Sequence, residues 1–424
     1  MRSFIDVDPN SHFPIQNLPY GAFITAEGDI HLCSRIGDYI IDLYVLDEEG
    51  FFDGEHLNDQ LAFLDSTLNY FMSLGQEAWK EARETLIDLF NDDNALLKNN
   101  EGLQSRVLIP IEEVTLVLPI EINNYTDFYS SEQHARNIGK IFRGNDELMP
   151  NWKHIPIGYH GRASSIVLSG TNVPRPNGQI LNASNEPEFK PSQKIDFELE
   201  MGFIMGTGNT LGEPIDINQA QNHIFGMVLV NDWSARDIQR WEYQPLGPFL
   251  SKSWATSISP WIVTMEALSP FKIDAPVQNP APLNYLKEDN RITFDINLEV
   301  QLGAAQSQKP TTISKTNYKY LYWSMAQQLT HHASNGCNIQ TGDLYASGTI
   351  SGNTPNSYGS MMELSWNGEQ PVELESGENR TFLKDGDQVI MTGYSQGDGY
   401  RVGFGEVSGV VLPATSSTSS FLSE

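Results

Sequence analysis

Short strand-like segments separated by glycine-bearing turns fill most of the chain beyond about residue 118, and they restrict the fold more than any other feature. Each segment is apolar throughout or alternates apolar and polar residues with period two, which is typical of β-strands. Long helical patterns are few. The segments are residues 195–205, 223–230, 292–302, 344–347, 361–366 and 388–392. We therefore predict a mainly β architecture with some α-helix.

The first 118 residues are organised differently and contain one clear helical pattern. In it, apolar residues recur at the spacing of a single buried helical face, and they are Trp79, Ala82, Leu86, Leu89 and Phe90. A domain boundary near residues 118 and 119 follows, which predicts a small domain of residues 1–118 and a larger one of residues 119–424.

The charge balance argues against several classes of protein. With 26 Lys and Arg against 54 Asp and Glu, the formal net charge is −28, whereas a nucleic-acid-binding protein needs surplus basic residues for phosphate contacts. We see no secretory leader and no segment near the ~20 apolar residues that cross a bilayer. Cys33 and Cys337 stand in no Cys-x-x-Cys pattern. We therefore expect a cytoplasmic protein with no disulfide, no nucleic-acid partner and no membrane partner.

Acidic and apolar residues alternate along the predicted strand that begins near residue 195. Asp196, Glu198 and Glu200 share one face of it, at roughly 6.5–7 Å intervals. Three such carboxylates repel one another unless water screens them or a cation lies between them. An edge strand that faces solvent would also explain the pattern.

Two further aspartates favour the cation. Asp232 directly follows the apolar segment 223–230 and Asn231, and Asp127 lies in another alternating segment. With Glu198 and Glu200 they would form an all-oxygen site suited to Mg²⁺ or Ca²⁺ rather than zinc. Spacing alone leaves open whether the strands that carry them converge.

A helix is predicted just after Asp232. Ser234 and Asp237 form a candidate N-cap pair for it, and Arg236, Gln239 and Tyr243 then fall on one helical face. That face could bind an anionic ligand or could be solvated.

His134 lies in another short predicted helix, which opens with a hydroxyl cap. A histidine suits a general base near neutral pH if an acceptor orients it, and Glu363, a carboxylate in an apolar segment, needs a partner of its own. A lone histidine is more often a surface or hydrogen-bonded core residue. No spacing in the sequence links His134 to Glu363, and the pairing rests only on each residue's need for a partner.

Several longer motifs resemble the fumarylacetoacetate hydrolase family. They are Phe13-Pro14-Ile15-Gln16-Asn17-Leu18-Pro19-Tyr20-Gly21, Asp127-Phe128-Tyr129-Ser130-Ser131, Gly158-Tyr159-His160-Gly161-Arg162-Ala163-Ser164-Ser165, Asn231-Asp232-Trp233-Ser234-Ala235-Arg236-Asp237 and Gly348-Thr349-Ile350-Ser351-Gly352. The resemblance runs from about residue 3 to about residue 413 and includes the N-terminal domain that smaller members lack. It implies a small N-terminal SH3-like β-barrel followed by a larger C-terminal β-roll, assembled as a homodimer.

The resemblance also implies an activity. This is the metal-dependent hydrolysis of the carbon–carbon bond of 4-fumarylacetoacetate, a small dianion, to fumarate and acetoacetate, which is the last step of tyrosine and phenylalanine breakdown. Position by position, it assigns metal carboxylates to Asp127, Glu198, Glu200 and Asp232, which leaves Asp196 outside them. It assigns the catalytic base to His134 and the orienting carboxylate to Glu363.

The resemblance assigns further residues to substrate binding and to a second metal ion. Substrate-binding positions are Tyr129, Arg143, Tyr159, Arg236, Gln239, Tyr243, Lys252 and Thr349. A second Mg²⁺ is associated in the family with Asp232, Lys252 and Thr256. Ser251 and Ala255 depart from the pattern, because the family has glycine there.

These residues suggest a mechanism and two alternatives. We expect Mg²⁺ or Ca²⁺ to act as a Lewis acid, His134 to deprotonate water, and a catalytic set of Arg236, Gln239 and Lys252 to stabilise the oxyanion. One alternative is hydrolysis of a shorter acylpyruvate. The other is a Ca²⁺-stabilised binding protein without turnover, which would leave His134 and Glu363 without a purpose.

Overall fold

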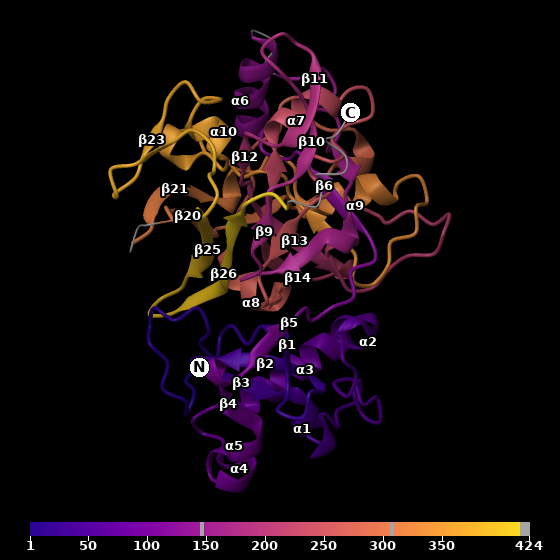
Figure 1. Cartoon of the computed structure of the whole chain (residues 1–424). Helices are drawn as coiled ribbons and strands as arrows, with labels where there is room; N and C mark the ends of the chain where they lie inside the picture. Colours follow the sequence, from indigo (N-terminus) through magenta and orange to yellow (C-terminus); the bar gives the residue numbers. More distant parts are fainter. Residues whose placement is uncertain (145–147, 306–308, 416–424) are drawn as a thin grey trace.

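The computed structural model describes residues 1–144, 148–305 and 309–415, which form a smaller N-terminal part and a larger C-terminal part (Figure 1). The N-terminal part contains a five-stranded antiparallel sheet of order β4-β3-β2-β1-β5. Its strands are β1 (Tyr20–Ile24), β2 (Ile30–Ile36), β3 (Tyr39–Asp42), β4 (Leu108–Pro110) and β5 (Thr115–Val117). Its helices are α1 (Leu43–Glu48), α2 (Asn69–Ser73), α3 (Gln76–Phe90), α4 (Ala95–Lys98) and α5 (Glu101–Val107).

The C-terminal part is built on two larger sheets and several short strand pairs. One sheet has the order β7-β6-β22-β13-β14-β16-β8, with β17 also paired to β14, and the other has the order β21-β20-β25-β26-β9. The first contains β6 (Tyr125–Phe128), β7 (Gly158–His160), β8 (Ile166–Leu168), β13 (Leu199–Met205), β14 (Ile224–Asp232), β16 (Thr256–Ile258), β17 (Val263–Thr264) and β22 (Leu344–Ala346). The second contains β9 (Val173–Pro174), β20 (Asn297–Gly303), β21 (Thr311–Asn317), β25 (Gln388–Gln396) and β26 (Arg401–Leu412).

The remaining elements complete the C-terminal part. The paired short strands are β10 (Asn177–Leu181) with β11 (Pro187–Pro191), β12 (Ile195–Asp196) with β15 (Ser234–Ala235), β18 (Lys272–Asp274) with β19 (Ile292–Phe294), and β23 (Val372–Glu373) with β24 (Asn379–Arg380). The helices are α6 (Glu132–Arg143), α7 (Arg236–Glu242), α8 (Met265–Leu268), α9 (Met325–Ala333) and α10 (Met361–Leu364). The predicted fold class, a small N-terminal SH3-like β-barrel before a larger β-roll, is confirmed. The boundary near residue 118 stays a prediction.

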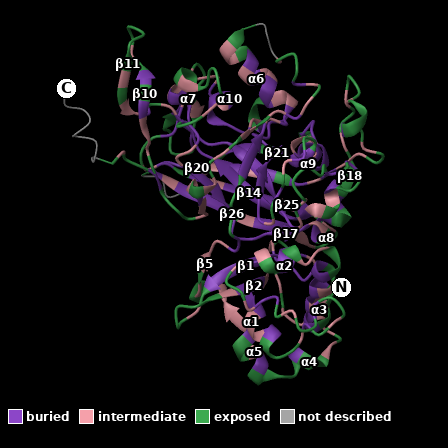
Figure 2. Cartoon of the chain, turned by 90° about the vertical axis from the view of Figure 1, so that its right-hand side faces the viewer, coloured by how far each residue is buried: buried purple, intermediate pink, exposed green. Residues whose placement is uncertain are grey.

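Strand β14 shows why its segment is apolar without alternation. Met227 and Leu229 belong to the core of the C-terminal part, whereas Phe225, Val228 and Val230 join the core that continues into the N-terminal part. Both faces of the strand are therefore covered, and a strand buried on both faces is uniformly apolar. Figure 2 shows buried residues along β14 and β26 at the centre of the C-terminal part.

The two parts are joined by aromatic packing. On α3, the predicted apolar face is buried, and the Trp79 ring lies 5.3 Å from the Phe225 ring of β14. Tyr20 of β1 lies 5.5 Å from the same ring. Each fully buried aromatic side chain contributes roughly 1.5–3 kcal/mol to the free energy of unfolding, so this contact fixes the N-terminal part against the sheet that carries the acidic residues.

Three predicted strands differ in the structure. Segments 195–205 and 292–302 are each divided into two strands, and the segment 361–366 begins with helix α10 instead of a strand. The Ser360 hydroxyl caps α10 by accepting a hydrogen bond from the Glu363 backbone N–H at 3.3 Å. An apolar run this short does not distinguish a strand from a helix, and the cap decides between them.

Across the described ranges, no helix combines the length and the apolar character that crossing a bilayer requires.

Candidate active site

Three buried carboxylates meet where strands of the first sheet lie side by side. Asp127 is on β6, Glu200 on β13 and Asp232 at the end of β14, and one carboxylate oxygen of each lies within 4.8 Å of the other two. Strand β22 brings them together, because it pairs parallel to β6 on one side and antiparallel to β13 on the other. The strands that the sequence could not join do converge.

The electrostatics of this acidic triad (Asp127, Glu200 and Asp232) call for a cation. Burial raises the pKa of each carboxyl group, and the neighbouring carboxylates raise it further. One oxygen of each residue is buried and has no hydrogen-bond partner within the described structure. Three neighbouring carboxylates, each with a buried oxygen that has no donor, would be satisfied by a hard divalent ion, so the residues present fit such an ion.

Glu198 lies next to the triad but has its own cations. Its carboxylate contacts the Arg236 guanidinium, accepts a hydrogen bond from Thr349 Oγ1 at 2.7 Å, and lies 3.0 Å from Lys252 Nζ. Burial alone would raise the pKa of Glu198, but Arg236 and Lys252 outweigh burial and lower it. Glu198 is therefore an ionised neighbour of the triad, and its assignment as a metal ligand stays a prediction.

Asp196 holds Arg236 in place from the opposite side. Its carboxylate accepts from Arg236 Nε at 2.7 Å and from the Met361 and Met362 backbone N–H groups at 2.6 and 3.0 Å. The guanidinium is thus clamped between two carboxylates. The alternating acids of the sequence are all buried, which excludes the solvent-facing edge strand, and the apolar residues between them lie in the core of the C-terminal part.

Lys252 is a buried cation beside the triad. Its ammonium group bonds to Asp232, and although burial lowers the pKa of Lys252, Asp232 and Glu198 outweigh it and raise the value. Thr256 of β16 lies opposite Asp232 in the strand register and is buried. The predicted second ion near these residues stays a prediction.

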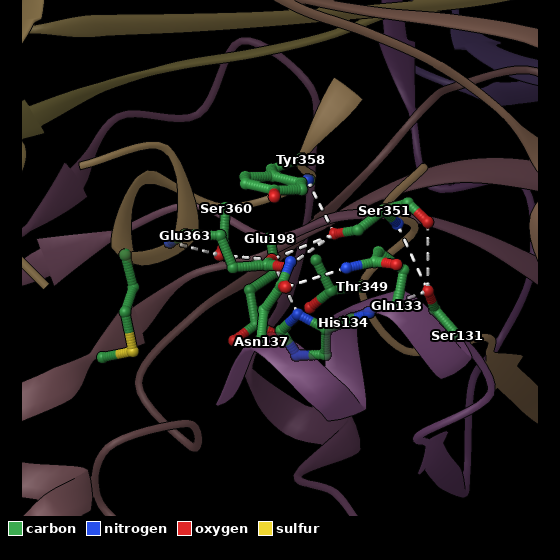
Figure 3. A network of polar contacts seen from close by, with 12 residues as sticks. Ser131, Gln133, His134, Asn137, Glu198, Thr349, Ser351, Tyr358, Ser360 and Glu363 are labelled. Atoms are coloured by element: carbon green, nitrogen blue, oxygen red, sulfur yellow. Dashed lines mark hydrogen bonds and ion pairs between the residues drawn. The ribbon is translucent and has the colours of Figure 1, made fainter. Parts of the chain in front are cut away.

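A buried histidine and glutamate form the second feature of the site (Figure 3). His134 lies in α6, where its backbone N–H donates to the capping Ser131 hydroxyl, and His134 Nδ1 lies 2.7 Å from Glu363 Oε2. The two residues are 229 positions apart in the sequence, so no spacing argument could join them.

Further donors fix Glu363. Its carboxylate accepts from Asn137 Nδ2 at 2.8 Å, from Ser351 Oγ at 2.9 Å and from Ser360 Oγ at 2.8 Å. Burial would raise the pKa of Glu363, but His134 and these hydrogen bonds reverse the effect and lower it. Sequence reasoning missed these three donors, although Asn137 stands one turn after His134 on the same helix.

Asp127 of the triad and His134 line one cavity of about 390 Å³. Asp127, Glu198, Arg236 and Lys252 line it together with His134, and so do the other predicted substrate-binding residues, which are Tyr129, Arg143, Tyr159, Gln239, Tyr243 and Thr349. Glu200, Asp232, Glu363 and Thr256 do not line it and act from behind this layer. The apolar walls, which sequence reasoning did not find, include Ile138 and Phe142 of α6, Met149 and Ile157.

The predicted cap of α7 is wrong. The helix begins at Arg236 after Ala235, with no side-chain cap. Ser234 Oγ instead donates to Glu198 at 3.2 Å, and the Asp237 carboxylate accepts from Ser192 Oγ at 2.5 Å. Both polar side chains are used by the site and its supporting loop, so tertiary contacts replace the local cap.

The chain matches two family models, one described as fumarylacetoacetate (FAA) hydrolase C-terminal, over residues 123–411, and one as fumarylacetoacetase N-terminal, over residues 16–119. The chain therefore belongs to the fumarylacetoacetate hydrolase family. The fumarylacetoacetase of Mus musculus is 54% identical over 418 residues, which cover 98% of this chain and 99% of that protein. The fumarylacetoacetase of Arabidopsis thaliana is 51% identical over 417 residues, covering 98% and 99%.

A solved structure supports the fold. A fumarylacetoacetate hydrolase from Exiguobacterium antarcticum superposes with a TM-score of 0.51 at 16% sequence identity, covering 93% of this chain and 99% of that chain.

Proposed function

We propose that this protein is a hydrolase that cleaves the carbon–carbon bond of 4-fumarylacetoacetate, giving fumarate and acetoacetate in the last step of tyrosine and phenylalanine breakdown. Relatives named fumarylacetoacetase, 51–54% identical over 98% of the chain, support this activity. The structural observation that carries the proposal is that His134, held by Glu363, lines the same cavity as the carboxylates of Asp127 and Glu198. A binding protein would have no use for that pair.

Asp127, Glu200 and Asp232, with Glu198 beside them, would hold a Mg²⁺ or Ca²⁺ ion. The all-oxygen donor set and the three unpartnered buried oxygens support a hard cation. When bound, the ion supplies a Lewis acid for the two carbonyl oxygens of the substrate's 1,3-dicarbonyl group. A second ion near Asp232, Lys252 and Thr256 belongs to the same proposal, and the facing register of Asp232 and Thr256 supports it.

His134 would act as the general base. Glu363 accepts at Nδ1, which keeps that nitrogen protonated and leaves Nε2 free to take a proton from water. The water oxygen then bonds to the carbonyl carbon next to the fumaryl group. The bond from that carbon to the acetoacetate fragment breaks, the fragment keeps the electron pair, and its carbon takes up a proton.

Cationic and amide donors would stabilise the oxyanion formed on that carbonyl. Arg236, Gln239 and Lys252 line the cavity, and Arg236 and Lys252 are held in place by buried carboxylates before any substrate arrives. One such preorganised donor is typically worth ~10²–10³ in rate. Substrate contacts would come from Tyr129, Arg143, Tyr159, Tyr243 and Thr349, which line the same cavity.

The setting of the enzyme is also proposed. We infer two domains of residues 1–118 and 119–424, assembled as a homodimer in the cytoplasm, with neither a nucleic-acid nor a membrane partner. The net charge of −28 supports the absence of a nucleic-acid partner.

The test is loss of the substrate's ultraviolet absorbance when purified protein is added to 4-fumarylacetoacetate. It is repeated after chelation and after Mg²⁺ or Ca²⁺ is restored, and the products are identified. Metal-dependent formation of fumarate and acetoacetate supports the proposal, and His134→Ala should lose turnover while keeping its fold and its metal. No turnover of this substrate but turnover of a shorter acylpyruvate would replace the proposed substrate. No turnover of either by folded, metal-loaded protein would favour a binding protein.

A further inference from the structure

The cavity contains one cation that the proposed mechanism leaves without a task. Four arginine and lysine side chains line it, and they are Arg143, Arg236, Arg240 and Lys252. Asp196 and Glu198 hold Arg236, and Asp232 and Glu198 hold Lys252. Arg143, on α6, already interacts with other residues of the chain.

Arg240 differs from these three. Its guanidinium has no hydrogen bond and no ion pair with any residue in the described ranges, although acidic residues outnumber basic ones about two to one in this chain. The residue is exposed, whereas Arg236, one turn earlier on α7, is buried. Arg240 therefore lies at the solvent end of the cavity, with its charge uncompensated.

The helix geometry directs Arg240 along the cavity. Arg236, Gln239, Arg240 and Tyr243 follow one another at the spacing of a single helical face, and all four line the cavity. Across from them, Phe142 of α6 stacks on Tyr243 with ring centroids 6.4 Å apart. The α6 and α7 side chains thus form apolar and cationic walls that lead from the acidic floor to Arg240.

The structure of the substrate indicates where its carboxylates lie in the cavity. 4-Fumarylacetoacetate carries a carboxylate at each end and its dicarbonyl group in the middle. With the dicarbonyl group held beside Asp127 and Glu198, where the proposed ion would lie, both substrate carboxylates extend away from that point, in opposite directions along the cavity. At least one of them must extend toward the opening, where Arg240 presents donors that suit a carboxylate.

We propose that Arg240 binds one terminal carboxylate of the substrate, so that it is a specificity-determining residue for dianionic over monoanionic dicarbonyl compounds. The inference rests on the proposed function and adds a residue that neither the sequence motifs nor the oxyanion argument assigned. Arg240 does not touch the reacting atoms in this arrangement, so it acts on KM more than on kcat.

The experiment compares three substrates. They are 4-fumarylacetoacetate, fumarylacetone, which lacks the acetoacetate carboxylate, and crotonylacetoacetate, which has a methyl group in place of the fumaryl carboxylate. Each is tested with the unmodified protein, Arg240→Gln, Arg240→Lys and a control variant, Lys287→Gln. Lys287 is exposed and lies outside the cavity lining, so its removal measures the general effect of one lost positive charge.

The expected result is selective. For the dianion, Arg240→Gln should lower kcat/KM by about 10-fold or more, chiefly through KM, because a charge-assisted hydrogen bond is lost. For one of the two monoanions it should change kcat/KM less than about twofold, because that substrate lacks the carboxylate that Arg240 binds. Arg240→Lys should retain part of the activity, and Lys287→Gln should match the unmodified protein.

Other outcomes overturn the inference. An equal loss on all three substrates would make Arg240 a general electrostatic residue, and no loss on the dianion would remove it from the site. If the unmodified protein hydrolyses none of the three, the proposed function fails instead. Circular dichroism of each variant verifies that the fold is kept.

Discussion

Replacing Glu363 by glutamine tests the central pair of the site. The substitution keeps the size of the side chain but removes its charge and turns one acceptor oxygen into an NH₂ donor. The affected oxygens accept from His134 and Ser360 on one side and from Asn137 on the other, with Ser351 within 3.0 Å of both.

The magnitude follows from these contacts. The glutamine oxygen can replace the acceptor for Asn137, and the serine hydroxyls can rotate, so only the contact with His134 must change its polarity. We expect the variant to lose about 1.5–3 kcal/mol in the free energy of unfolding, the usual worth of a hydrogen bond to a charged group.

The effect on catalysis should be much larger than the effect on stability. In Glu363→Gln the amide N–H donates to His134 Nδ1, which moves the ring proton to Nε2 and removes the base. Loss of the correct tautomer in a histidine–carboxylate pair typically lowers kcat by about 10³–10⁴. Asn137→Ala is the matched control, because it removes a neutral donor from the same carboxylate and leaves the His134 contact intact.

Three measurements decide the outcome. Urea unfolding gives the change in stability, and loss of substrate absorbance gives kcat, while ¹⁵N chemical shifts of the His134 ring report its tautomer. We expect Asn137→Ala to stay within about 10-fold of the unmodified kcat while losing about 1 kcal/mol of stability. If Glu363→Gln kept kcat within about threefold of the unmodified protein, His134 would not need orientation by Glu363 to act as the base.

The remaining predictions concern pH, metal and backbone. Burial and two nearby arginines lower the pKa of His12 to about 4 from 6.5, so only the unfolded chain binds a proton between these values. Stability should therefore decrease as the pH falls through that window, by up to about 3 kcal/mol, and urea unfolding of His12→Asn should lack this component. Chelation should lower Tm, and adding Mg²⁺ or Ca²⁺ at about 100 times its Kd should raise the free energy of unfolding by about 2.7 kcal/mol. In calorimetry, the Tm of Glu200→Gln should rise less when the ion is added. In Gly348→Ala the new Cβ would lie 2.1 Å from a backbone oxygen of β6 at a φ of +77°, so both Tm and kcat should fall. Gly28→Ala, at a φ of +95° with no atom within 4 Å, should cost only about 1 kcal/mol and leave kcat unchanged.

Local patterns predicted the parts of the site that depend on neighbouring residues. The period-two alternation at Asp196, Glu198 and Glu200 correctly separated acidic from core-facing side chains, because a strand imposes that period on its own. The hydroxyl cap of α6 was predicted for the same reason, since Ser131 and His134 are three positions apart.

Features that depend on distant segments were outside the reach of the sequence. Glu363 was expected in a strand, and only the cap by Ser360 and its contacts with α6 place it in a helical turn. Asp237 was expected to cap α7, but Ser192 recruits it. Arg240 was missed because the sequence pattern on α7 was defined by Arg236 and the residues three and seven positions after it. Arg240, four positions after Arg236, lies on the same helical face.

Strand β22 has a consequence for how the protein is made. Asp127 and Glu200 belong to strands that both pair with Leu344–Ala346, a segment that carries none of the acidic residues and is synthesised more than 100 residues after the last of them. A nascent chain that stops before this segment lacks the strand that joins them, although Asp127, Glu200 and Asp232 are all present. An ion held by these three carboxylates would therefore stabilise only the late, nearly complete fold, because the acidic residues come together last.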